Sequence, residues 1–318
     1  MDRPPARPRD ALALLEPGAI LRGALAQTLA ASIDRAERLP VGTRLGAFRI
    51  TGEIGAGGMG VVYAAERDDG EFRQSVAIKC IDRRTGDAGH ALFLRERQIL
   101  ADLRHPHIAR LLDGGRHADG RLWFAMERVE GQRIDLHARA GGLDAGARIG
   151  LLLQVVDAVG FAHERLLLHR DIKPANVLVD ADGRARLLDF GIAALAGDGT
   201  AQGAYSPAWA SPEQRAGADV GPASDQYQLG LLLDALLREA TPADATPGAG
   251  DATRATTAIA AGEDAADRPR EPDPAHWRRM PRARAAELAA IASRATAADP
   301  ARRYASVREF GADLQRWR

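Results

Sequence analysis

The chain has 318 residues, of which 46% are hydrophobic and 27% charged, with 43 basic and 43 acidic side chains. This composition is typical of a globular protein that builds its core without disulfides or structural metals, and the charge balance argues against nucleic-acid binding. Cys80 is the only cysteine, which excludes an intrachain disulfide, and no apolar run reaches the roughly 18 residues of a membrane span.

Residues 1–43 are expected to form a leader that is partly helical or disordered, because a Pro- and Arg-rich start precedes an irregular helical spacing. From Phe48 onward, short runs rich in β-branched residues predict strands, and one amphipathic segment predicts a helix. In chain order, the predicted strands are 48–55, 60–67, 75–82, 108–114 and 122–130, and the predicted helix is 88–103.

After residue 131 the pattern becomes mostly helical, with the strongest helices at 151–166 and 226–240. The second of these is apolar around its centre, which indicates burial. A polar, loose insert is expected at about 241–275. A strand-rich part at 44–130 and a helical part at 131–318 predict an α+β fold of two lobes with a cleft between them.

Three glycines, Gly55, Gly57 and Gly60, have G-x-G-x-x-G spacing between two predicted strands. Glycine lets backbone approach a ligand closely and lets N–H groups face phosphate oxygens. The same spacing suits a purely structural hairpin, so that alternative stays open. A dinucleotide-binding fold would need a helix after the glycines, whereas the sequence continues as a strand.

Lys79 lies in a strand-like stretch, VAIK, where a solvated edge lysine is the simple interpretation. The functional interpretation is a point charge that reaches phosphate oxygens. Such a lysine needs an anion to hold it in place, and Glu96 on the predicted helix is the natural partner. An ordinary surface role for Glu96 stays open.

The stretch HRDIKPANVLV gathers side chains suited to phosphoryl transfer. The carboxylate of Asp171 can orient an attacking hydroxyl and take its proton, while Lys173 can neutralise phosphate charge. The amide oxygen of Asn176 and the carboxylate of Asp189, in the DFG triplet, are oxygen ligands of the kind that Mg²⁺ prefers. His169 is interpreted as a packing and hydrogen-bonding residue rather than a base.

The glycine loop, strand lysine, helical glutamate, HRDxKPxN and DFG follow one another in the order found in protein kinases. Over residues 44–318 the chain resembles the eukaryote-like (Hanks-type) serine/threonine protein kinases of bacteria. The resemblance implies a two-lobed protein kinase fold with a small β-rich N-lobe and a larger, mostly helical C-lobe. It also implies transfer of the γ-phosphate of ATP to Ser/Thr hydroxyls of proteins, including autophosphorylation of the activation loop.

The implied cofactors are ATP and Mg²⁺, with Mn²⁺ as an alternative metal. The resemblance assigns catalytic roles to Asp171, Lys173, Lys79 and Glu96 and metal binding to Asn176 and Asp189. ATP contacts fall to residues of both lobes, and the apolar ones are also plain core residues. These are Ile54, Gly55, Gly57, Gly60, Val62, Ala77, Lys79, Met126, Glu127, Val129 and Leu178.

The resemblance further implies that Arg170, directly before Asp171, pairs with a phosphorylated activation loop. The candidate phosphate acceptors in that loop are Thr200, Ser206 and Ser211. Structural roles are expected for Glu213, paired with Arg303, and for Asp225, which should hold the backbone of the catalytic loop, the HRDIKPAN stretch at residues 169–176.

Two rival classes remain. A catalytically silent pseudokinase scaffold usually lacks a member of the lysine, HRD or DFG set, and all three are present here. A small-molecule kinase of the aminoglycoside phosphotransferase type generally lacks the Lys173–Pro174 pair and the Ser-Pro-Glu segment. The expected partners are protein substrates and, for autophosphorylation, a second copy of the chain; the expected location is the cytoplasm, with no nucleic acid and no membrane span.

Overall fold

The computed structural model describes residues 38–57, 60–84, 97–98, 100–190, 206–238 and 280–318. Within the chain, Val41–Arg318 forms one compact unit. Several predictions fall outside the described residues: the expected leader up to residue 37, most of the predicted 88–103 helix with Glu96, the acceptor candidate Thr200 and the expected insert.

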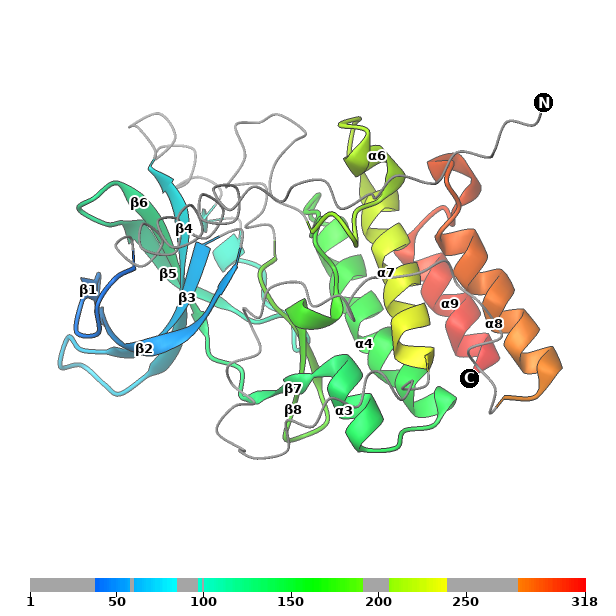
Figure 1. The fold of residues 1–318 in the computed structure, drawn as a ribbon, viewed down its shortest axis with the longest axis horizontal. Helices are drawn as coiled ribbons and strands as arrows, with labels where there is room; N and C mark the ends of the chain where they lie inside the picture. The colour runs from blue at the N-terminus through cyan, green and yellow to red at the C-terminus, as the bar shows by residue number, and fades with distance from the viewer. Residues whose placement is uncertain (1–37, 58–59, 85–96, 99, 191–205, 239–279) are drawn as a thin grey trace, which may run out of the picture. The chain divides into compact units, whose positions relative to one another are not determined.

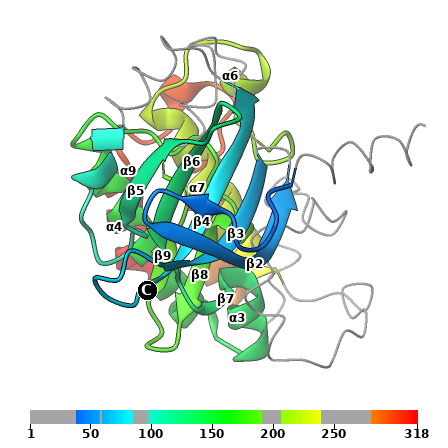
Figure 2. The same cartoon turned by 90° about the vertical axis from the view of Figure 1, so that its left-hand side faces the viewer.

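The first half of this unit is a six-stranded antiparallel sheet in the order β1-β2-β3-β4-β6-β5 (Figures 1 and 2). Strand β4 is central and is buried from Val76 to Ile81, which explains its continuous run of β-branched and small apolar residues. The strands are β1 (Arg44–Leu45), β2 (Phe48–Gly57), β3 (Gly60–Arg67), β4 (Ser75–Arg84), β5 (Leu111–Arg116) and β6 (Arg121–Glu127).

Gly60 begins β3 with φ +121°, and a Cβ at this position would lie 1.9 Å from the carbonyl oxygen of Cys80. Only glycine permits this approach of β3 to β4. The packing of β3 against β4 therefore requires glycine at this third position of the motif, whether or not a ligand is bound.

The second half is helical, with a small three-stranded sheet in the order β7-β8-β9. The strand-rich first half and this second half are connected by residues 127–131, between β6 and β7. The elements are β7 (Gly131–Arg133), α3 (Ile134–Ala140), α4 (Ala145–His163), η1 (Pro174–Asn176), β8 (Val177–Asp180), β9 (Ala185–Leu187), α6 (Pro212–Arg215), α7 (Pro222–Leu237), α8 (Arg282–Ala295), η6 (Pro300–Arg302) and α9 (Val307–Trp317).

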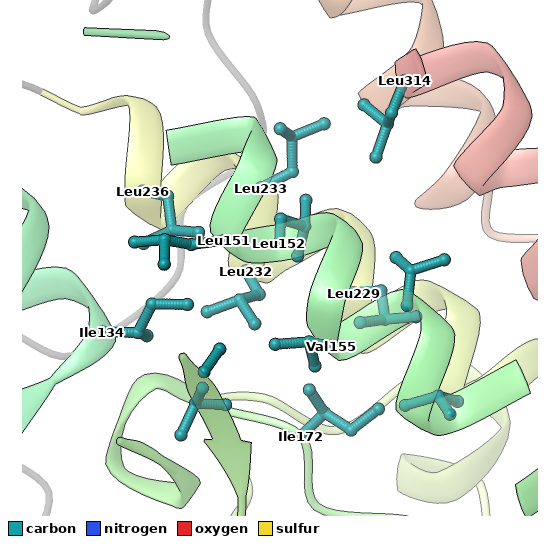
Figure 3. Packing of buried hydrophobic residues seen from close by; sticks show 14 of the residues in the cluster. Ile134, Leu151, Leu152, Val155, Ile172, Leu229, Leu232, Leu233, Leu236 and Leu314 are labelled. Carbon is teal, nitrogen blue, oxygen red and sulfur yellow. The ribbon is translucent and has the colours of Figure 1, made fainter. Parts of the chain in front are cut away.

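Helices α4 and α7 lie side by side at the centre of this half and share its core (Figures 1 and 3). In Figure 3, Leu152 and Val155 of α4 and Leu229 of α7 lie together with Ile172 of the catalytic loop. Among the described helices, α4 is long and apolar enough to cross a membrane by length and composition, and half of that stretch is buried in the unit. A core helix has the same pattern.

The predicted strand-rich and helical halves are confirmed, while helix boundaries differ. Helix α4 begins six residues before the predicted 151, because Asp144 caps the amide of Ala147. It ends at His163 rather than 166, since Leu166 has a left-handed φ of +60°. Helix α7 begins at Pro222 rather than 226, since proline suits the first helical turn.

Candidate active site

A pocket lies between strands β2, β3, β4 and β6 on one side and Leu178 of β8 with Leu188 and Asp189 on the other. Its lining is mostly apolar, and residues 127–129 also contribute to it. Seven of the residues to which the resemblance assigns ATP contacts line it together: Ile54, Val62, Ala77, Met126, Glu127, Val129 and Leu178. The mostly apolar lining suits a flat ring such as adenine.

The connection beside this pocket is fixed by a side chain from the other half. The carboxylate of Glu127 accepts a hydrogen bond of 2.6 Å from Arg186 on β9. The Glu127 amide in turn donates to the carbonyl of Arg110 at 2.9 Å. These contacts hold the edge of the pocket at a set position.

Lys79 of β4 contacts Asp189, one of the residues that line the pocket. Its ammonium lies 2.7 Å from Oδ2 of Asp189, and the two side chains are 7% and 13% exposed. Asp189 has a left-handed φ of +57° and lines the pocket, so the ion pair lies at the pocket's boundary. The expected partner Glu96 lies outside the described residues, and Asp189 is the partner seen here.

Asp171 is nearly buried, and three groups contact its carboxylate. Oδ1 accepts from the amide of Ser206 at 3.0 Å, and Oδ2 lies 3.2 Å from the ammonium of Lys173 and 3.1 Å from Nδ2 of Asn176. Burial pushes the pKa of Asp171 upward, but the charge of Lys173 and the Ser206 amide outweigh it and hold the pKa below its ordinary value. The carboxylate is therefore ionised at neutral pH.

Ser206 and Ser211, two of the candidate phosphate acceptors, are buried and bonded. The ammonium of Lys173 donates to Oγ of Ser206, which is 5% exposed. Ser211 is fully buried and caps α6: its Oγ accepts from the Gln214 amide, and Oε1 of Gln214 accepts from the Ser211 amide. Both hydroxyls thus have structural partners around the catalytic loop.

The donor set fits a magnesium ion. Both hydrogen bonds of the Asn176 side chain use Nδ2, to the carbonyl and carboxylate of Asp171, which leaves the amide oxygen as the end that can bind a cation. The amide of Leu188 donates to the Asn176 carbonyl at 2.9 Å, so Asn176 and Asp189 lie on adjoining backbone. One carboxylate and one amide oxygen, completed by phosphates and water, is a typical Mg²⁺ environment.

Asp225 at the start of α7 is fully buried and holds the backbone of the catalytic loop, as the resemblance implies. Its Oδ2 accepts from the amide of His169 at 2.9 Å and from Nε2 of His163 at 2.8 Å, and its Oδ1 accepts from the amide of Arg170 at 2.7 Å. Burial pushes the pKa of Asp225 upward, and these donors more than offset it and lower the pKa.

His169 is a structural residue, as its sequence context suggested. Its Nδ1 accepts from the amide of Asp171 at 3.2 Å, so Nε2 carries the proton that is donated to the carbonyl of Leu188 at 2.9 Å. The ring also packs edge-on against Phe190. His169 thereby joins the catalytic loop to the segment that carries Asp189.

Glu213 and Arg303 form the expected ion pair. The guanidinium donates to both carboxylate oxygens at 2.7 and 2.9 Å, and Arg303 also donates to the carbonyls of Ala223 and Ala297. Burial pushes the pKa of Glu213 upward, but the Arg303 and Ser224 hydrogen bonds lower it to about 2. This ion pair links α6 to Arg303, which directly follows η6 and lies more than 80 residues later in the sequence.

Several site residues were missed in the sequence. Leu188, Ala109 and Arg128 also line the pocket, and Leu188 could have been found as the residue directly before DFG. Gln214 and Gln228 bind the catalytic loop; Gln214 directly follows Glu213, whereas no motif marked Gln228.

The sequence profile of the protein kinase domain family matches residues 48–310. The chain therefore belongs to the protein kinase family. Among its relatives is the serine/threonine-protein kinase PknJ of Mycobacterium tuberculosis, which is 35% identical over 283 residues covering 86% of this chain and 46% of PknJ. The kinase Pkn3 of Myxococcus xanthus is 33% identical over 291 residues, or 84% of this chain and 49% of Pkn3.

The crystal structure of the M. tuberculosis PknI kinase domain superposes with a TM-score of 0.65 at 30% identity, covering 88% of this chain and all of that one. The two-lobed protein kinase fold and the bacterial serine/threonine branch are thus confirmed. The chain spans about half the length of curated relatives such as PknJ and Pkn3.

Proposed function

We propose that this chain is an active protein serine/threonine kinase that transfers the γ-phosphate of ATP to hydroxyls of protein substrates. The observation that carries the proposal is the surrounding of Asp171: an ionised carboxylate, with Lys173 and Asn176 in contact, beside a pocket suited to adenine. This arrangement supplies positioning and charge, which are what phosphoryl transfer requires from a protein.

In this mechanism the pocket orients the nucleotide, and Asp171 orients the attacking hydroxyl and accepts its proton. Lys173, held near Asp171, neutralises charge on the transferred phosphoryl group, and Lys79 does so on the other phosphates. Asp189 and Asn176 would hold a Mg²⁺ ion, which would supply further neutralisation of phosphate charge; Mn²⁺ would suit the same oxygen ligands. Glu96 remains the proposed second partner of Lys79.

We also propose autophosphorylation, with Thr200 as the favoured acceptor. Ser206 and Ser211 are 5% and 0% exposed and have structural partners, so a phosphate on either would require the loop to open. Arg170 supports a phosphate-binding role, because its Nε is buried and has no hydrogen-bond partner among the described residues. Autophosphorylation between molecules would need transient self-association.

A cytoplasmic site of action is part of the proposal, because ATP and the protein substrates of such a kinase are found there. The resemblance to serine/threonine kinases, rather than any feature of the pocket, supports the choice of Ser and Thr over other acceptors. The proposed substrate is therefore a protein that is phosphorylated on Ser or Thr side chains.

The test is intact-mass spectrometry of the purified chain after incubation with Mg-ATP, beside Asp171→Asn. Asp182→Asn is the matched control, since Asp182 is an exposed carboxylate in the β8–β9 turn. Added phosphates in the wild type and control, but not in Asp171→Asn, are expected, and peptide mapping then identifies the acceptor. If the wild type modifies neither itself nor generic protein substrates, the scaffold function takes its place.

A further inference from the structure

The catalytic loop has an unusual hydrogen-bond pattern: four consecutive amides each donate to a side chain. The amides of His169 and Arg170 donate to Asp225, that of Asp171 donates to His169, and that of Ile172 donates to Oε1 of Gln228 at 2.7 Å. Buried amides need partners, and a loop without helix or strand pairing obtains them from side chains. The position of Asp171 therefore depends on these side chains.

Two glutamines hold the carbonyl side of the same segment. The carbonyl of Arg170 accepts from Nε2 of Gln214 at 2.8 Å and from Nε2 of Gln228 at 2.9 Å. Gln228 also donates to Oε1 of Gln214 at 3.0 Å, so the two amides form one hydrogen-bonded unit, the Gln214–Gln228 pair. Both residues are at most 2% exposed.

The pair acts on a residue whose backbone conformation is costly. Arg170 has φ +70°, in the left-handed region that side-chain-bearing residues rarely adopt. Its amide is held by Asp225 and its carbonyl by both glutamines, so three side chains fix this single residue. The conformation of Arg170 sets the direction in which the next residue, Asp171, leaves the loop.

The other end of the segment is anchored in the core. Ile172 is fully buried and packs among the α4 and α7 side chains (Figure 3), while its amide is bound by Gln228. Asp225 and Gln228 are three residues apart on α7 and thus share one face of that helix. Gln228 therefore contacts the residues on both sides of Asp171, namely Arg170 and Ile172.

We infer that the Gln214–Gln228 pair positions the catalytic aspartate, and that Gln228 is a positioning residue for phosphoryl transfer. The inference rests on the proposed kinase function. Gln228 touches neither the nucleotide pocket nor Asp171 itself, so its loss should alter the rate of transfer while nucleotide binding stays unchanged.

Helix α7 offers a matched control. Gln226 is as buried as Gln228, and its side chain also binds backbone at both ends, accepting from the amide of Tyr304 at 2.9 Å and donating to its carbonyl at 3.2 Å. Gln226→Leu removes two buried hydrogen bonds of α7 and Gln228→Leu removes three, and only the second substitution affects the catalytic loop. The free energy of unfolding should fall in both variants.

The experiment compares kcat, the KM for ATP and amide hydrogen exchange in wild type and the two variants. Gln228→Leu is expected to lower kcat about tenfold or more while KM for ATP stays within about twofold. Exchange of the amides at 169–172 should accelerate in Gln228→Leu alone. Gln226→Leu should keep the wild-type kcat.

A second variant protects the test if Gln228→Leu does not fold. Gln214→Glu keeps the oxygen that accepts from Ser211 but loses the donor to the Arg170 carbonyl, so kcat should again fall with KM unchanged. Equal kcat losses in the Gln226 and Gln228 variants, or faster loop exchange with unchanged kcat, would overturn the inference. An inactive wild type would instead overturn the proposed function, while the exchange data still report whether the pair holds the loop.

Discussion

The ammonium of Lys79 and the carboxylate of Asp189 lie 2.7 Å apart, joining β4 to the segment that follows β9. Both side chains are nearly buried, so each compensates the charge of the other. The proposed mechanism uses the same two groups for phosphate charge and for the metal. This ion pair therefore links the strand that carries Lys79 to the segment that carries Asp189.

Lys79→Met and Asp189→Asn should each leave the fold intact and lower the rate of transfer about 100- to 1,000-fold. Each removes an electrostatic contact of a kind that stabilises a transition state by about 3–4 kcal/mol. Steady-state kinetics with near-UV circular dichroism as a folding check measures both. A folded variant that keeps about a tenth or more of the wild-type rate would contradict these assignments.

The Glu213–Arg303 ion pair should make the free energy of unfolding depend on pH in the acidic range. The folded pKa of Glu213 is about 2, below the ordinary 4.5, so its contribution is present above pH 4.5 and is lost as pH falls toward 2. The contribution is at most about 3 kcal/mol. Urea unfolding of wild type and Glu213→Gln should therefore show a stability difference at pH 6 that shrinks by pH 3. A difference that stays constant over that range would show that the pair does not titrate as expected.

Gly60→Ala should destabilise the sheet and impair nucleotide binding, because a Cβ would meet the Cys80 carbonyl at 1.9 Å and φ is +121°. Such strain costs about 1–3 kcal/mol. Gly52→Ala, also in the β2–β3 pairing, is the control, since its Cβ would meet no described atom within 4 Å. Thermal unfolding and the KM for ATP should separate the two variants; equal effects would argue against the clash.

Leu166→Gly should stabilise the protein by about 0.5–1 kcal/mol. Leu166 is 92% exposed and has φ +60°, so glycine at this position removes the left-handed strain and loses little packing. The larger conformational entropy of glycine in the unfolded chain offsets part of this gain in stability. The same substitution at Leu136, inside α3, should destabilise by about 1 kcal/mol. Denaturant unfolding of both variants tests the opposite signs, and a loss of stability at Leu166 would refute the argument.

Residues whose role depends on a local motif could be placed from the sequence. The order of the motifs predicted that the pocket residues, Asp171, Lys173 and Asn176 would gather, and the structure brings them together. The sheet-rich and helical halves followed from the change in hydrophobic period. Helix ends were less accurate, because a cap such as Asp144 depends on local geometry that the hydrophobic pattern does not contain.

Residues whose role depends on tertiary contacts could not be placed in this way. Gln228 looks like an interior residue of an apolar helix, and only the fold brings it to Arg170 and Ile172, more than 50 residues earlier. Ser206 was predicted as a phosphate acceptor because it is a hydroxyl in the right segment, and its burial against Lys173 was invisible in the sequence. Nothing in a sequence pattern distinguishes an exposed serine from one bonded to a lysine such as Lys173.

The reliance of the catalytic loop on side chains from α6 and α7 has an evolutionary consequence. The motif that performs the chemistry and the residues that hold it are separate stretches of sequence. If Gln228 positions Asp171 as inferred, substitutions in α7 would change the rate of transfer while residues 169–176 stay unchanged. Divergent copies of such a gene could acquire different turnover rates while keeping the same nucleotide and the same reaction.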